Sequence, residues 1–86
     1  MHTVELLEEA LEVARELGFE VRHEWLGGGG GGACEFGGRK CLFVDLSLNS
    51  LEQLDQVSEA LQCDPAIYLL SLSREMRRQL GIQLSA

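Results

Sequence analysis

The chain has few of the features that mark several large classes of protein. It contains one proline, one tryptophan and one tyrosine. It has seven lysine and arginine residues but fourteen aspartate and glutamate residues. The net charge of −7 disfavours nucleic acid and anionic membrane surfaces, because both attract basic side chains. No apolar run approaches the ~18 residues of a membrane-spanning helix. We therefore expect neither a nucleic-acid partner nor a membrane partner.

Signals for export and for a strong metal site are also missing. The N-terminal stretch carries glutamates every few residues in place of the apolar core of a signal peptide. The three cysteines form no CxxC pair, and there is no helical HxxxH. An odd number of cysteines without an export signal indicates reduced thiols, so we expect a cytoplasmic protein that holds no cofactor.

What the chain does have indicates one small domain over residues 1–86. Hydrophobic residues make up 45% and charged residues 24%, which is usual for a globular domain. Glycine is the exception, because eight of the ten glycines lie between positions 27 and 38.

Three segments have helical periodicity. Residues 3–17 place apolar side chains at helical spacing opposite a face of glutamates. Residues 51–61 repeat this pattern after a polar cap, and Pro65 prevents the helix from continuing. A last helix, capped by Ser71 or Ser73, extends to the glycine near the C-terminus.

The intervening sequence predicts three strands. Residues 19–26 alternate in polarity, 33–36 form a short strand, and 39–48 are strongly apolar. The glycines at 27–32 predict a mobile loop, because ordering glycine is entropically costly. The glycine pair at 37–38 favours a two-residue hairpin turn.

That turn sets the register of the hairpin. Cys34 then lies opposite Cys41, and Glu35 lies opposite Lys40 as an ion pair on the solvent face. The sheet face expected to pack against the first two helices carries Val21, His23, Trp25, Cys34, Phe36, Cys41 and Phe43.

The other face of the third strand is apolar as well, with Leu42, Val44 and Leu46. Strands that are buried on both faces are apolar on both faces, so we expect a later segment or a second copy of the chain to cover this second face of the strand. The predicted fold is α+β in the order α-β-β-β-α-(β)-α. It is a three-stranded antiparallel meander packed against helices, with residues 66–70 as a short parallel fourth strand or the first turn of the last helix.

The glycine run has three interpretations. A phosphate loop needs a helix N-terminus and usually a lysine behind the glycines, whereas a strand is predicted here. A flexible hairpin loop is the favoured interpretation. The third is a flap that closes on a peptide or a partner.

Cys34, Cys41, His23 and Cys63 are the candidates for a thiol or metal site. The hairpin can supply two ligands, but the spacing does not fix a third or fourth. Core packing is favoured, because free cysteine is among the most buried residue types. A Cys34 nucleophile with His23 as its base would need a pocket on a face that we expect to be covered. A Cys34–Cys41 disulfide is disfavoured in a hydrogen-bonded strand pair.

Asp45 stands at the end of the third strand, on the side expected to face the core. A buried carboxylate must be paired or hydrogen-bonded, so we expect it to accept backbone N–H groups at the turn into the second helix. No second carboxylate is placed to share acid–base catalysis with it.

The run GGACEFGGRKCLFVD, followed by Leu51-Glu52-Gln53-Leu54 and Ile67-Tyr68-Leu69, resembles a group of short bacterial proteins to which no activity is assigned. The resemblance implies a shared small α+β fold. The order strand, G-x-C hairpin, strand and helix is also similar to compact HExxH zinc peptidases. Here that helix reads SLEQLDQVSEALQ and contains no histidine, so the zinc chemistry does not carry over.

We therefore expect a protein without catalytic activity. The predicted function is contact with another protein, or self-association as a homodimer, through Leu42, Val44 and Leu46. The alternative is a thiol- or metal-binding protein that uses Cys34 and Cys41.

Overall fold

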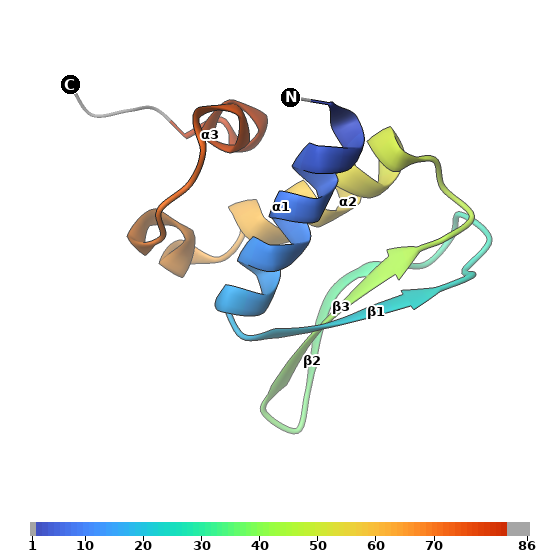
Figure 1. Ribbon diagram of the computed structural model, residues 1–86. Coiled ribbons are helices and arrows are strands. Elements are labelled where there is room, and N and C mark those ends of the chain that lie inside the picture. Colours follow the sequence, from blue (N-terminus) through green and yellow to red (C-terminus); the bar gives the residue numbers. More distant parts are fainter. Residues whose placement is uncertain (1, 83–86) are drawn as a thin grey trace.

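A computed structural model describes residues 2–82. The elements follow one another as α1 (Thr3–Glu16), β1 (Phe19–Glu24), β2 (Gly32–Phe36), β3 (Arg39–Asp45), α2 (Ser50–Gln62), the 3₁₀ helix η1 (Pro65–Leu69) and α3 (Arg74–Leu80). Figure 1 shows two layers, with α1 and α2 side by side on one face of the sheet. The α+β class is thus confirmed.

The sheet has the order β1-β3-β2, so β3 lies in the centre. β2 pairs with β3 in the predicted register, with Cys34 opposite Cys41. β1 pairs with β3 in parallel, from Phe19 opposite Lys40 to Glu24 opposite Asp45. The predicted antiparallel meander is therefore wrong. The glycine-rich connection between β1 and β2 is long enough to pass the end of β3, and the most apolar strand takes the interior position.

The predicted fourth strand is also absent from the described chain. Residues 66–70 lie in and just after η1, whose first position is Pro65. Asp64 caps it by accepting a hydrogen bond from Ala66 N at 3.0 Å. The fixed φ of proline and this side-chain cap favour a helical turn over an extended strand.

The parallel pairing decides which face of the sheet is buried. Val21 lies opposite Leu42, so the apolar side of β1 joins the side of β3 that carries Leu42 and Val44. Both of these side chains are 0% exposed beneath the helices. The prediction that the aromatic and sulfur face packs against the helices is wrong, and Trp25 and Phe36 are exposed.

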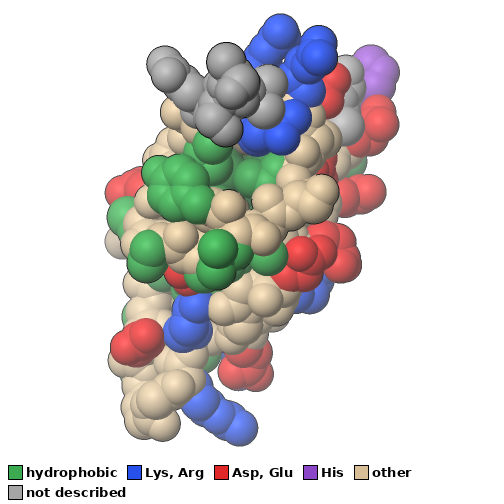
Figure 2. All heavy atoms as spheres, turned by 90° about the vertical axis from the view of Figure 1, so that its left-hand side faces the viewer, with side chains coloured by type: hydrophobic (Ala, Val, Ile, Leu, Met, Phe, Trp, Pro, Cys, Tyr) green, Lys and Arg blue, Asp and Glu red, His purple; other side chains and the backbone are tan. Residues whose placement is uncertain are grey.

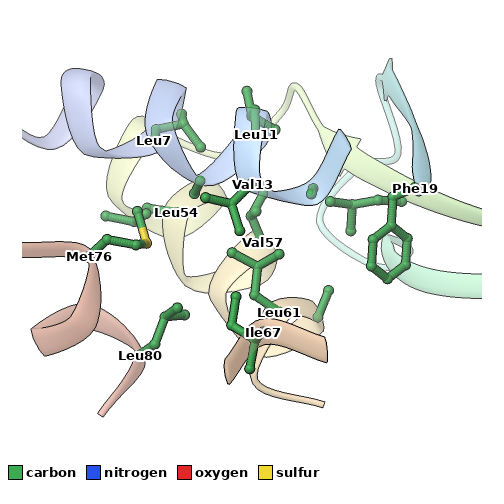
Figure 3. Close-up of a cluster of buried hydrophobic side chains, with 14 of the residues drawn as sticks. Leu7, Leu11, Val13, Phe19, Leu54, Val57, Leu61, Ile67, Met76 and Leu80 are labelled. Carbon is green, nitrogen blue, oxygen red and sulfur yellow. The ribbon is translucent and has the colours of Figure 1, made fainter. Parts of the chain in front are cut away.

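The core lies between the two layers. Figure 3 shows Leu7, Leu11 and Val13 of α1 near Leu54, Val57 and Leu61 of α2, with Phe19, Ile67, Met76 and Leu80 around them. Local signals set the helix ends. Asn49 and Glu52 form a capping box, Ser73 caps α3, and Gly81 ends α3 in the left-handed conformation.

Within residues 2–82, none of the helices has the length and apolar character needed to cross a lipid bilayer.

Candidate functional site

The predicted interaction residues do not form a surface. Leu42 and Val44 are fully buried under α1 and α2, and Leu46 is half-buried just after β3. Self-association through these residues therefore loses its basis, because the chain itself covers them.

The predicted thiol and metal residues are divided between different parts of the fold. Cys34 and Cys41 are cross-strand neighbours, whereas His23 pairs with Val44 and so belongs to the other face of the sheet. Cys63 is exposed at the end of α2. No three side chains of the metal-binding types come together in the described part of the chain.

Cys41 is poorly suited to reaction or to metal binding. Burial, the Glu20 carboxylate and the Cys34 thiol all raise the pKa of Cys41. Its sulfur lies 3.7 Å from Glu20 Oε2, to which it donates a hydrogen bond. Since the thiolate is the nucleophile and the metal ligand, these neighbours oppose both roles.

Asp45 is fully buried and holds the glycine-rich connection to the end of β3. Its carboxylate accepts hydrogen bonds from Leu26 N at 3.0 Å, Gly28 N at 2.7 Å, Ser47 N at 2.9 Å and Ser47 Oγ at 2.7 Å. Burial alone would raise the pKa of Asp45, but these hydrogen bonds lower it to about 2. The predicted anchoring role at the turn is confirmed. The contacts to Leu26 and Gly28 were not predicted, because those residues are 19 and 17 positions away.

The far end of the same connection rests on α2. Gln56 Oε1 accepts a hydrogen bond from Asp45 N at 3.0 Å, and a β-carbon added at Gly31 would overlap the Gln56 side chain. The glycines lead into strand β2, so no helix N-terminus stands behind them and the phosphate-loop interpretation gains no support.

Lys40 holds the opposite end of β3. Its Nζ donates to Leu17 O and to Asp64 Oδ2, each at 2.7 Å, and lies 4.4 Å from the centre of the Phe19 ring. The hydrogen bond from Lys40 lowers the pKa of Asp64. These contacts replace the ion pair predicted between Lys40 and Glu35.

A groove runs between β2 and α2, because the helix contacts this strand without covering all of it. Ala33 is exposed, although its cross-strand partner Leu42 is fully buried. The groove consists of two adjoining hollows of about 430 and 510 Å³ that share Ala33, Ala60 and Cys63. The α2 wall is formed by the helical stripe Gln56, Glu59, Ala60 and Cys63.

β2 is also the less protected of the two sheet edges. The edge strand β1 carries Glu20, Arg22 and Glu24, and charged side chains discourage pairing with another strand. β2 reads GACEF, with a single charge. In an antiparallel pair, hydrogen-bonded and non-hydrogen-bonded residue pairs alternate along the strands, starting with a hydrogen-bonded pair next to a two-residue turn. Ala33 and Glu35 therefore fall in non-hydrogen-bonded pairs, and their backbone N–H and C=O groups point away from β3.

A second exposed apolar surface lies over η1. Figure 2 shows apolar side chains gathered there, and Tyr68 and Leu69 are 71% and 85% exposed. Neither of these two residues lines the groove between β2 and α2.

The groove was not predicted from the sequence, although the sequence contains one feature that belongs to it. Gln56, Glu59, Ala60 and Cys63 form a helical stripe of small and polar residues beside the leucine stripe of α2. Such a stripe is also typical of a solvated helix face, so the position of β2 was needed to interpret it.

Comparison of the chain with models of known families, with curated proteins and with solved structures found no match, so the resemblances inferred from the sequence stay predictions.

Proposed function

We propose that this protein is a non-catalytic binding module that receives an extended segment of another protein along the free edge of β2. The observation that carries the proposal is the exposure of Ala33 beside the fully buried Leu42. α2 leaves this part of β2 uncovered, and the groove between the two elements lies beside the free edge of β2.

The length of β2 suits pairing with a short strand. A strand added to the sheet lies ~4.8 Å from its neighbour and rises ~3.3 Å per residue. The five residues of β2 therefore match a segment of about four to six residues. Its backbone would pair with the outward groups of Ala33 and Glu35, and alternate side chains would enter the groove against Ala60 and Cys63.

A different protein suits this edge better than a second copy does. Each copy carries a net charge of −7, and the groove brings Glu35 and Glu59 to the contact. Two identical acidic edges repel one another across a shared contact.

The arrangement of reactive groups also supports binding over catalysis. Cys34 and His23 lie on opposite faces of the sheet, so they do not form a nucleophile–base pair. The Asp45 carboxylate is occupied by its four hydrogen bonds.

The proposal is tested by selecting linear peptides from a displayed random library against the purified protein. Enriched peptides are then added to ¹⁵N-labelled protein. We expect shifts of the backbone amides of Ala33 and Glu35, together with slower alkylation of Cys63. The proposal is overturned if no peptide is enriched, or if the shifts centre on Tyr68 and Leu69.

A proline variant tests the strand pairing itself. Glu35→Pro removes an outward N–H without breaking the ladder to β3, and Glu35→Gln is the matched control that removes only the charge. We expect Glu35→Pro to weaken peptide binding at least tenfold relative to Glu35→Gln, with circular dichroism confirming that both variants fold. Equal affinities for the two folded variants would refute binding at this edge.

A further inference from the structure

We infer that the segment received by this groove is basic, with a lysine or arginine directed between Glu35 of β2 and Glu59 of α2. This inference rests on the proposed function and specifies the chemistry of the partner.

The two glutamates lie in the two adjoining hollows of the groove, Glu35 in the first on the β2 wall and Glu59 in the second on the α2 wall. Glu35 lies across from Lys40 and therefore belongs to the side of β2 that faces α2, and Glu59 belongs to the lining stripe of α2. Both are exposed, and neither forms an ion pair with another described residue. Their charges are therefore available to a ligand.

The cation at the end of the groove does not offset them. Among the residues that line the two hollows, Lys40 alone is basic, and its Nζ is already held by Asp64 and by the Leu17 carbonyl. The Lys40–Asp64 pair is neutral as a unit, so Glu35 and Glu59 leave the groove negative.

The small side chains of the groove leave room for a long basic residue. Ala33 and Ala60 offer methyl groups where larger residues would fill the hollow. The aliphatic stem of lysine or arginine can lie on this apolar surface while its charged end reaches the carboxylates at the rim. An acidic segment would instead meet two like charges.

Three end-blocked heptapeptides of alternating threonine and valine serve as probes, with lysine, norleucine or glutamate at the centre. Binding is measured by fluorescence anisotropy at low and high salt. We expect the lysine peptide to bind about tenfold more tightly than the norleucine peptide at low salt, and the glutamate peptide to bind most weakly. The preference for lysine should shrink at about 1 M salt, where the screening length falls to ~3 Å.

Charge-removing variants locate the effect. We expect Glu35→Gln and Glu59→Gln each to weaken lysine-peptide binding about threefold, and the double variant to weaken it about tenfold. The norleucine peptide should be unaffected. Glu8→Gln, on the exposed face of α1, is the matched control and should change neither affinity.

The outcomes separate the two proposals. Equal binding of the three peptides, weakened by Glu35→Pro, overturns the basic segment and leaves edge binding in place. A preference for the glutamate peptide also overturns the basic segment. Absence of binding by all three peptides, or binding that ignores Glu35→Pro, overturns the proposed function together with this inference.

Discussion

At the scale of single residues, two charged side chains at opposite ends of β3 fix the connections around the sheet. Asp45 joins the glycine-rich connection and the turn into α2 to one end of the strand. Lys40 joins the end of α1 and the start of η1 to the other end. Each side chain links segments that are distant in the sequence, and so each should affect stability more than a surface charge does.

Asp45 predicts a specific loss of stability in acid. The pKa of Asp45 is about 2 in the folded protein and ~3.9 in an unfolded chain, so the unfolded state binds the proton more readily. Its stabilising contribution is complete above about pH 5 and is lost as the pH falls towards 2. Asp45→Asn should lower the thermal midpoint at pH 7, and the gap to the native protein should close as the pH falls. Melting curves from pH 7 to pH 2 provide the check, with Glu8→Gln as control. A gap that stays constant over this range would show that Asp45 does not act through its ionised form.

Lys40 predicts a larger effect than an exposed ion pair. Lys40→Met leaves the mostly buried Asp64 carboxylate and the Leu17 carbonyl without their donor, which should cost about 1–3 kcal/mol in the free energy of unfolding. Arg15→Met is the matched control, because it breaks the exposed pair with Glu12 and should cost less than about 0.5 kcal/mol. Urea unfolding of both variants measures the difference. Similar losses for the two variants would contradict the role given to Lys40.

At the scale of elements, the hairpin and the helices were predictable from the sequence, and the position of β1 was not. The glycine pair fixed the register of β2 and β3 locally, and caps and periodicity fixed the helices. The alternation of apolar and polar residues along β1 is compatible with pairing to β2 and with pairing to β3 alike. Its actual place depends on Asp45 holding Leu26 and Gly28 at the end of β3, which no local pattern encodes.

The contact between the glycine-rich connection and α2 provides an element-scale prediction. Gly31→Ala should displace Gln56 and break its hydrogen bond with Asp45 N, at a cost of about 1 kcal/mol in the free energy of unfolding. Gly29→Ala is the matched control, because its added methyl group meets open space. In a Gln56→Ala background the cost of Gly31→Ala should fall to the part that its positive φ imposes. Denaturant unfolding of this double-mutant cycle measures the coupling, and additive losses would count against the contact.

At the scale of the whole molecule, helices cover one face of the sheet and leave the β2 side partly uncovered. The sequence had suggested an uncovered apolar face on β3, but the fold buries that face and leaves a groove with acidic walls at the edge. The candidate site therefore arises from the way the layers are offset.

Charge repulsion predicts the assembly state. With −7 on each copy and acidic groups at the open edge, we expect a monomer in low-salt buffer over micromolar to millimolar concentrations. Sedimentation velocity across this range is the measurement. A dimer that Glu35→Pro dissociates would identify a second copy as the occupant of the groove, against the proposal of a different partner.

The sequence by itself determined the three α-helices, the hairpin with its register, and the end of α3 at Gly81. These depend on interactions between residues a few positions apart, which periodicity and turn chemistry record directly. Only the tertiary structure decided the strand order, the buried face and the groove. Those features depend on which strand takes the centre of the sheet and on how far α2 reaches across it, and both are set by contacts such as Asp45 to Gly28 and Lys40 to Asp64 between distant parts of the chain.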